Sequence, residues 1–361
     1  MRIELIKRPQ QSALFSAVSP LLALGLTVIA GFIIFSLLGK PPLEALYIYF
    51  IEPLSETWQL HELAIKAAPL IMIAVGLSVC YASNNWNIGA EGQFIIGGIA
   101  GSLIPILMPD FQNFLTLPLM LLFGFIGGAA MGAIPALLKT KFNTNEILTS
   151  LMLVYVAQLF LDWLARGVFR DPNGNNFPGS IRFPSAARLP EIIPSQGSAH
   201  LGIVLAIIAA IIVWVMMKYL LRGFEVKVLG GSPRAGRFAG FSSTKMVFFA
   251  FILSGGLAGL AGISEVSGAI GQLRETISPG YGFAAIIVAF LGRLNPLGAI
   301  AAGFVLALTY LGGEGAQMSL GISDKVARVF QGLLLFFVLG CDTLIHYRIR
   351  LVFGDPVKVS R

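Results

Sequence analysis

The sequence has few charged residues, cysteines and histidines, and these shortages exclude several classes of protein. Charged residues make up 12% of the 361 residues, about half the usual share for soluble domains. The two cysteines, Cys80 and Cys341, lie beside or within apolar runs, which fits buried thiols and excludes a disulfide framework. His61, His200 and His346 are dispersed, and no HExxH, CxxC or GxSxG motif occurs. We therefore expect no metal site, no bound cofactor and no catalytic site.

The sequence also lacks the phosphate-binding loop GxxxxGK[ST], so it has no visible means of binding ATP. The run Leu253-Ser254-Gly255-Gly256 spells the start of a signature of certain ATPases. It lacks the following glutamine and lies within an apolar run. We interpret this match as a coincidence.

Long apolar runs are what the sequence has in abundance. Hydrophobic residues make up 56% of the chain, and several runs reach the roughly 20 residues that cross a bilayer. The sequence therefore predicts an all-α, polytopic helical membrane protein. The net charge of +7 does not indicate nucleic-acid binding, because Lys and Arg concentrate between the apolar runs, where they set orientation. The N-terminal MRIELIKRPQ is not expected to be a cleavable signal.

We expect about ten transmembrane segments in a single transmembrane domain that covers residues 1–361. The expected spans are 19–38, 63–81, 88–108, 114–138, 143–165, 201–221, 247–266, two short or re-entrant helices within 283–310, and 326–341. The break in 283–310 falls at Gly292-Arg293-Leu294-Asn295-Pro296. Basic residues near both ends, including Arg8, Lys358 and Arg361, predict cytoplasmic termini. The loop 166–200 would then lie outside and the basic segment 222–245 inside.

Small residues spaced four apart predict close helix packing. They form three sets: Gly97 and Gly101; Gly124, Gly128 and Gly132; and Gly255 and Gly259.

The stretch 81–98, YASNNWNIGAEGQFIIGG, places polar residues between apolar flanks. Asn84, Asn87, Glu91 and Gln93 are the ones we expect along a transport path, since ionisable groups at membrane depth usually face a cavity or a partner. Residues 87–90 read as a helix break and restart, with Asn87 as a cap and Glu91 in the first turn. The alternative is a simple loop followed by a capped helix.

A second polar group, Asn143-Thr144-Asn145-Glu146, begins the fifth span. Thr144 or Asn145 can cap that helix. Asn145 is also a candidate for the transport path. For Asn143, Asn145 and Glu146, structural packing and path lining are both open.

The segment 222–245, RGFEVKVLGGSPRAGRFAGFSSTK, combines positive charge with a helix-start signal. Ser232 caps and Pro233 occupies the first helical position, which predicts a short helix over 234–241. Arg234, Arg237 and Phe238 would project from it. The segment either docks a cytoplasmic partner or only sets membrane orientation.

Four motifs together give a family resemblance. NIGAEGQF (87–94), TNEILTSLMLVYVA (144–157), GSPRAGRFAGF (231–241) and SPGYGFAAIIVAFLGRLNPLG (278–298) resemble ABC-transporter permeases of the ribose/branched-chain amino-acid type. Within that type they are most similar to the nucleoside/simple-sugar branch, which works with basic-membrane-protein-type binding lipoproteins. The branch usually has Asn-Pro followed by Ala-Ala-Arg-Tyr-Ala-Gly where this chain has Ser232-Pro233 followed by RAGRFAG.

The resemblance implies a coupling helix at 231–241 with Ser232, Pro233, Arg234, Arg237 and Phe238 at the ATPase contact. It also implies that residues 87–93, together with Tyr281–Phe283, line or gate the path. The expected function is the permease subunit of an ATP-driven importer in the bacterial cytoplasmic membrane. It would form half of a path for a nucleoside or related purine or pyrimidine.

The implied partners are a separate ATPase that binds ATP and Mg²⁺, a second homologous permease in a heterodimer, a periplasmic binding lipoprotein and membrane lipid, with no nucleic acid. A simple sugar such as a pentose is the alternative solute. An ion-coupled transporter that acts without an ATPase is the alternative class, with Glu91 or Glu265 as its ionisable residue. A membrane scaffold would leave Glu91 and the broken helices unexplained.

Overall fold

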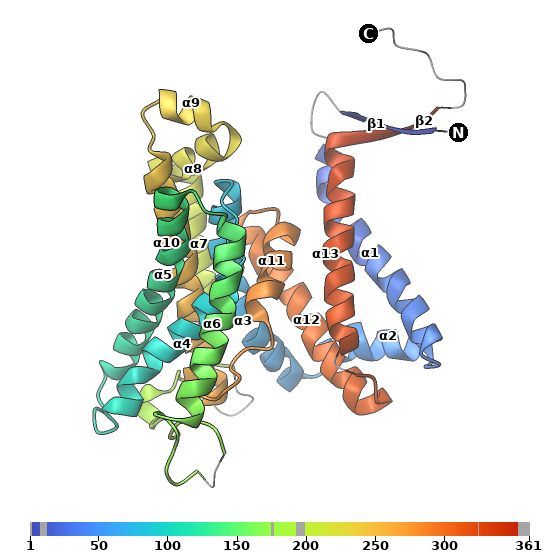
Figure 1. Ribbon diagram of the computed structural model, residues 1–361. Helices are drawn as coiled ribbons and strands as arrows, with labels where there is room; N and C mark the ends of the chain where they lie inside the picture. Colours follow the sequence, from blue (N-terminus) through green and yellow to red (C-terminus); the bar gives the residue numbers. More distant parts are fainter. Residues whose placement is uncertain (1, 8–12, 175–176, 193–198, 324, 353–361) are drawn as a thin grey trace. The chain divides into compact units, whose positions relative to one another are not determined.

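The structure is a computed structural model that describes residues 2–7, 13–174, 177–192, 199–323 and 325–352. Arg8, Lys358 and Arg361, on which the expected cytoplasmic termini partly rest, lie outside these ranges. Within them the chain is predominantly helical, which confirms the predicted fold class (Figure 1). In the described part of the chain, seven helices are long and apolar enough to cross a membrane, and three shorter apolar helices cover 21–37, 281–291 and 328–341. The count of ten spans stays a prediction.

The helices follow the predicted spans within a few residues at most boundaries. The longer ones are α1 Ala13–Leu37, α3 Thr57–Ala82, α4 Ala90–Leu107, α5 Thr116–Phe142, α6 Glu146–Arg166, α7 Gly202–Tyr219, α10 Ser243–Glu265, α12 Pro296–Leu320 and α13 Lys325–His346. The shorter ones are α2 Pro42–Phe50, α8 Leu221–Gly231, α9 Pro233–Phe238 and α11 Tyr281–Leu291, with single turns η1 Glu52–Leu54, η2 Ser185–Ala187 and the π-helical η3 Val266–Ile270. Helices α2 and α8 lie almost entirely between the predicted spans.

The chain forms two compact units, of which the first comprises residues 1–48 and 316–361. Helices α1 and α13 pack together in this unit, with the rings of Phe35 and Phe330 5.4 Å apart. Strand β1 Arg2–Lys7 pairs antiparallel with β2 Tyr347–Val352. This strand pair departs from the expected all-helical chain. RIELIK and YRIRLV largely alternate polar and apolar residues, the pattern of a strand.

The second unit, residues 49–315, is a helical bundle around α3. Every residue of 67–81 is buried, as expected for a helix that is apolar on all sides. Helices α4, α5, α7, α10 and α11 contact α3 or one another. The α6–α7 loop (167–201) lies at one end of this bundle and α9 at the other (Figure 1). We call these the loop end and the α9 end.

The predicted close packing at glycines is confirmed where α4 and α5 meet α10. A Cβ placed on Gly97 would lie 2.1 Å from the Cα of Gly259, and one on Gly128 would lie 2.2 Å from the carbonyl oxygen of Gly255. A Cβ on Gly132 would lie 2.4 Å from the carbonyl oxygen of Phe251. The three backbones therefore approach to distances that no larger residue permits, as at small-residue interfaces of membrane helices.

The predicted break at 292–296 is confirmed, but one expectation about it is wrong. Helix α11 has 11 residues, as a short half-helix should, whereas α12 has 25 residues and is not short. Arg293 and Leu294 adopt positive φ values of 59° and 53°, which ends α11. Asn295 Oδ1 then accepts a hydrogen bond from Leu297 N at 3.1 Å, and Pro296 opens the helix. Helix α12 then continues to Leu320.

Candidate transport path and coupling surface

The predicted break before α4 is held by a buried side-chain network. Asn87 Nδ2 donates to Gln93 Oε1 at 2.9 Å and to Ser254 Oγ at 3.1 Å, while Gln93 Nε2 donates back to Asn87 Oδ1 at 3.1 Å. Asn87 and Gln93 are almost completely buried. In this conformation both amides are satisfied by protein, so they fix the shape of the break. Their predicted place on the path stays a prediction.

Asn87 differs in one respect from the expected role of helix cap. Its Oδ1 accepts from Gly89 N at 3.0 Å, and Gly89 is the residue that precedes the first turn of α4. This bond two residues along the chain is an Asx-turn. The turn ends the extended stretch and lets α4 begin at Ala90 with Glu91 in its first turn, as expected.

An aromatic cluster supports the same break and was not anticipated from the sequence. Tyr81 stacks on Phe290 with ring centroids 5.3 Å apart, and Trp86 lies 5.3 Å from Tyr81. The Tyr81 hydroxyl donates to the carbonyl oxygen of Asn87 at 3.0 Å. The sequence signal was available, since both Tyr81 and Trp86 flank the asparagines. Their partner Phe290 lies about 200 residues away, a separation that only folding resolves.

Glu91 lies where the N-termini of α4 and α11 meet. Its Oε2 accepts a hydrogen bond from Gly282 N at 2.6 Å, and only 2% of the residue is exposed. A Cβ on Gly282 would lie 2.2 Å from Glu91 N, so the two helix starts are in backbone contact. The N-terminus of a helix carries partial positive charge. The Glu91 carboxylate is therefore stabilised by two helix dipoles and an amide donor.

Glu91 also lines a cavity of about 210 Å³, which we call the Glu91 cavity. Its other lining residues come from α4, α6 and the segment before α11: Ile95, Gln158, Leu161, Glu275, Thr276, Ile277 and Ser278. Sequence reasoning did not select Gln158, Glu275 or Thr276. Glu275 stands in GQLRETISPG, a polar interruption between apolar runs that could have been recognised.

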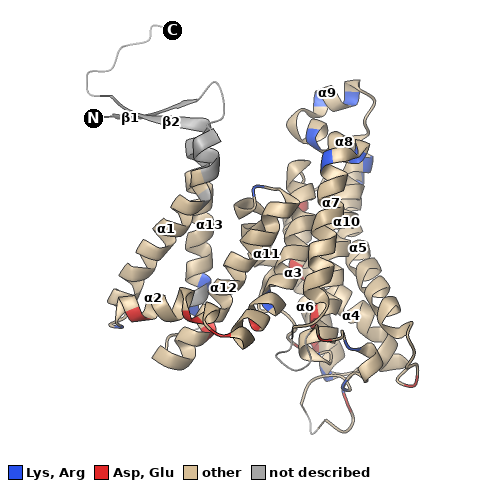
Figure 2. Cartoon of the chain, turned by 180° about the vertical axis from the view of Figure 1, so that it is seen from behind, with Lys and Arg blue, Asp and Glu red and all other residues tan. Residues whose placement is uncertain are grey.

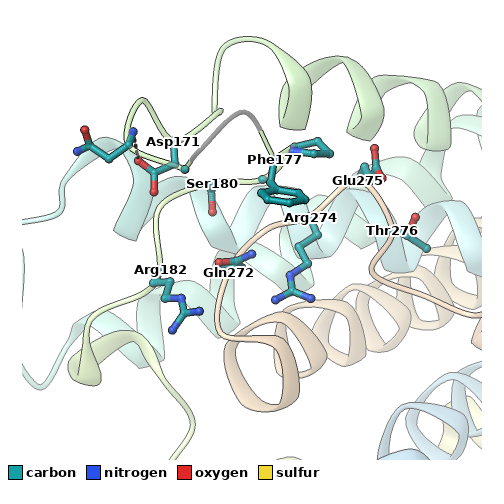
Figure 3. A pocket seen from close by; sticks show the side chains of 12 residues that line it. Asp171, Phe177, Ser180, Arg182, Gln272, Arg274, Glu275 and Thr276 are labelled. Carbon is teal, nitrogen blue, oxygen red and sulfur yellow. Dashed lines mark hydrogen bonds between the residues drawn. The ribbon is translucent and has the colours of Figure 1, made fainter.

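A larger pocket of about 870 Å³, the loop pocket, lies under the α6–α7 loop. Its lining includes Asp171, Phe177, Arg182, Gln272, Arg274 and Glu275, which Figure 3 labels. The loop is joined to the segment after η3, since Ser180 N donates to the Leu273 carbonyl at 2.8 Å and Phe183 N to that of Gly271 at 2.9 Å. This pairing places Arg182 and Arg274 in one wall, where Figure 3 shows both side chains extending toward the same side.

The predicted path residues Tyr281 and Phe283 begin α11 and have different surroundings. Tyr281 is buried, with its ring 6.1 Å from that of Phe94 and 5.6 Å from that of Tyr310. Phe283 is 39% exposed. Ser278 Oγ accepts from Gly280 N and Tyr281 N at 3.1 and 3.0 Å, which fixes the start of the helix.

The polar group before α6 lies at the α9 end. Asn145, not Thr144, caps α6, since its Oδ1 accepts from Ile147 N at 2.9 Å. Lys139 Nζ donates to Glu146 Oε1 at 2.6 Å and to Asn85 Oδ1 at 2.9 Å. These bonds give Asn145 and Glu146 structural partners. They do not test a role in the path.

The predicted start of the helix at Pro233 is confirmed, and its end is corrected. Helix α9 runs Pro233–Phe238 with Ser232 Oγ accepting from Ala235 N at 3.4 Å. It does not reach residue 241, because Gly240 adopts φ = +84° and reverses the chain. Phe238 is 98% exposed. Arg234 and Arg237 are also exposed, and Figure 2 shows positive residues gathered on α8 and α9.

Helix α8 connects this surface to the break. A Cβ on Gly230 would lie 1.9 Å from the carbonyl oxygen of Ala82, the last residue of α3. A cavity of about 260 Å³ lies at this contact and is lined by Asn84 and Asn85 of the break, Lys139 of α5 and Pro233 of α9. Helix α8 therefore contacts the start of the Asn-rich break directly, beside α9.

Two further ionisable residues lie elsewhere in the bundle. His200 accepts from Gly202 N through Nδ1 at 3.1 Å, and burial lowers the pKa of its ring to about 4. It is therefore neutral at pH 7 and acts as a packing residue before α7. Glu265, the residue of the ion-coupled alternative, is buried at the end of α10, and its Oε2 has no hydrogen-bond partner among the described residues.

These features define a class. The chain is a polytopic helical membrane protein with broken helices, cavities that reach a buried carboxylate and a basic, exposed helix at one end. The match Leu253–Gly256 lies inside α10, where Ser254 bonds to Asn87, so it is no ATPase signature here.

Comparison with known proteins identifies the family. Residues 59–339 match the family described as branched-chain amino acid transport system / permease component. The chain is 33% identical to the glucose ABC transporter permease of Haloferax volcanii, over 98% of this chain and 95% of that protein. It is 27% identical to the nucleoside permease NupB of Lactococcus lactis (88% and 89% covered) and 27% to the guanosine permease NupP of Bacillus subtilis (94% and 96%). A second permease similar to this chain occurs in Lactococcus lactis (NupC) and in Bacillus subtilis (NupQ).

The chain therefore belongs to the branched-chain amino acid type family of ABC transporter permease components. It is a multi-pass membrane subunit for transport and not an enzyme, because ATP hydrolysis in such systems belongs to a separate ATPase subunit.

Proposed function

We propose that this permease imports a nucleoside, with a related purine or pyrimidine as close alternatives. The α9 end would face the cytoplasm and an ATPase that binds ATP and Mg²⁺. The loop end would face a periplasmic binding lipoprotein. The observation that carries the coupling to an ATPase is α9, a capped basic helix with an exposed phenylalanine that is joined through α8 to the break before Glu91. The similarity to the nucleoside permease NupB and the guanosine permease NupP supports the solute.

The free energy for transport would come from ATP binding and hydrolysis by the partner ATPase. ATP binding brings the ATPase subunits into a state that holds α9 in a different position, and the permease equilibrium shifts by the difference in binding free energy between its two states. Because α8 abuts the end of α3, this shift would pass to the Asn-rich break and to Glu91.

A second permease would complete the path. Two similar permeases in each of Lactococcus lactis and Bacillus subtilis support a heterodimer. The expected site is the bacterial cytoplasmic membrane with both termini inside. The pairing of β1 with β2 supports termini on a common side, since it joins residues 2–7 to residues 347–352.

Charge reversal on α9 is expected to release the ATPase. In the Arg234→Glu/Arg237→Glu variant, two unfavourable charges replace favourable ones at the centre of the docking surface. We expect at least about tenfold less ATPase to co-purify from native membranes. Lys141→Glu/Lys227→Glu is the matched control, because it reverses two exposed charges at the same end outside α9. If the control releases as much ATPase, docking depends on overall charge and not on α9. If the α9 variant retains it, the docking site is elsewhere.

The solute is tested by ATP-driven uptake into proteoliposomes that contain the permeases, the ATPase and the binding protein. We expect guanosine uptake that other nucleosides inhibit and glucose does not. A specific observation favours glucose or another simple sugar as the second candidate, since the 33% identical relative from Haloferax volcanii is a glucose permease. Glucose uptake that nucleosides do not inhibit would replace the first proposal by the second.

A further inference from the structure

The loop pocket and the Glu91 cavity share one wall. Glu275 and Thr276 line both of them. Gln272 and Arg274 continue this wall into the loop pocket, while Ile277 and Ser278 continue it beside Glu91. The two cavities therefore follow each other along a single segment, 272–278, and meet at Glu275.

The backbone of this segment requires water or solute. The segment lies between η3 and α11 and is not helical. Among the described residues, the main-chain groups of residues 274–277 have no hydrogen-bond partner. Within a membrane protein, non-helical backbone is tolerated where protein groups pair it or where it lines a water-filled cavity. With no protein partner, these groups bond to water, since Arg274 and Thr276 are exposed and the two cavities adjoin the segment.

An ion pair stands at the point where the cavities meet. Arg166 donates to the Glu275 carboxylate from the last turn of α6, and its Nε donates to Asp162 Oδ1 at 2.6 Å. Glu275 and Arg166 are both partly exposed. A partly exposed pair contributes little stability, so it opens readily. It is strong enough to define a closed position and weak enough to be exchanged for contacts with a passing solute.

We propose that Glu275 gates a solute path that runs from the loop pocket to the Glu91 cavity along segment 272–278. In the closed state Arg166 holds Glu275 between the two cavities. In the open state the Glu275 carboxylate turns to the solute. The direction of passage, from the loop pocket inward, rests on the proposed function.

The groups along the inner part of this path favour a solute rich in hydroxyl groups. Glu91 and Glu275 are acceptors when ionised, and the Gln158 amide, Thr276 and Ser278 can also accept. Carboxylates are suited to the hydroxyls of a sugar ring, as in the binding of ribose hydroxyls by acidic residues. A sugar ring is common to nucleosides and hexoses, so the gate would serve either solute.

Cysteine accessibility tests the gate. In a Cys80→Ala/Cys341→Ala background with the ATPase co-expressed, Ile95→Cys reports on the Glu91 cavity and Gln272→Cys on the loop pocket. Intact cells are treated with a membrane-impermeant thiosulfonate. We expect Glu275→Gln to accelerate labelling of Ile95→Cys by about fivefold, the upper range for breaking a partly exposed pair. Labelling of Gln272→Cys should not change.

Asp171→Asn is the matched control, because it removes one negative charge from the same loop pocket without touching the Arg166 pair. Equal labelling of Ile95→Cys with and without Glu275→Gln would overturn the gate, as would an equal acceleration by Asp171→Asn. Guanosine and glucose uptake are measured on the same variants. If neither guanosine nor glucose is taken up but Glu275→Gln still accelerates labelling of Ile95→Cys, the proposed solutes are rejected and the gate is retained. Failure of the gate and failure of the proposed function are therefore distinguishable.

Discussion

Gly259→Val is expected to prevent accumulation of folded permease. The added side chain on α10 would meet the carbonyl oxygen of Gly124, which lies 2.2 Å from a Cβ at this position, and the Cα of Gly128 at 2.8 Å. Both are helix backbone atoms and cannot move without separating α5 from α10. Overpacking of a well-packed core typically costs about 1–3 kcal/mol, and backbone contacts belong at the upper end. We expect about a tenfold lower yield of monodisperse protein in detergent.

Gly332→Val provides the control for this prediction. Gly332 is also in a helix, α13, but no atom lies within 4 Å of a Cβ placed there. The Gly332→Val variant has the same change in helix propensity as Gly259→Val but introduces no steric clash. Wild-type yield and thermal midpoint for Gly259→Val would show that α5 and α10 do not pack through their glycines.

Glu91→Leu is expected to abolish transport. The substitution leaves Gly282 N without its acceptor and removes the carboxylate from between two helix N-termini. An unpaired buried donor costs about 1–3 kcal/mol, and the lost dipole interaction adds up to about 2 kcal/mol. The start of α11 should then separate from α4. We expect ATP-driven uptake at least about tenfold below wild type at equal amounts of reconstituted protein.

Glu91→Gln separates the two roles of this residue. The amide oxygen can still accept from Gly282 N, so the hydrogen bond is kept while the charge is lost. If Glu91 serves mainly to hold α11, the glutamine variant should keep most of the uptake. Glutamine as inactive as leucine would instead show that the charge itself is required. Glu44→Leu is the control, since Glu44 is also in a first helical turn, that of α2, but is exposed.

Local patterns in the sequence were sufficient for the class of protein and for most helices. A run of about 20 apolar residues is long enough to cross a bilayer, and within the bilayer a helix satisfies all the backbone hydrogen bonds of such a run. The start of α9 was equally local, because Ser232 and Pro233 act within one turn of the helix that they begin. The predicted end of α9 at residue 241 was wrong, because Gly240 adopts a positive φ that the helical pattern of the sequence does not indicate.

The polar residues of 84–93 were found from their apolar surroundings, but their roles were not. Sequence marks Asn87 and Gln93 as costly in a membrane. It does not show that each satisfies the other, because that depends on how residues 83–89 turn the chain between α3 and α4. Glu275 was overlooked for the opposite reason. Its surroundings in the sequence are polar, and only the return of segment 272–278 along α6 gives it a position between two cavities.

The sequence by itself determined that this chain is a helical membrane protein, where its helices break and which end is basic. These properties depend on hydrophobicity and capping within one or two helical turns. The tertiary structure alone decided that Glu91 meets the start of α11 and that Arg166 meets Glu275. These pairs are separated by 191 and 109 residues, so no local pattern in the sequence could indicate them.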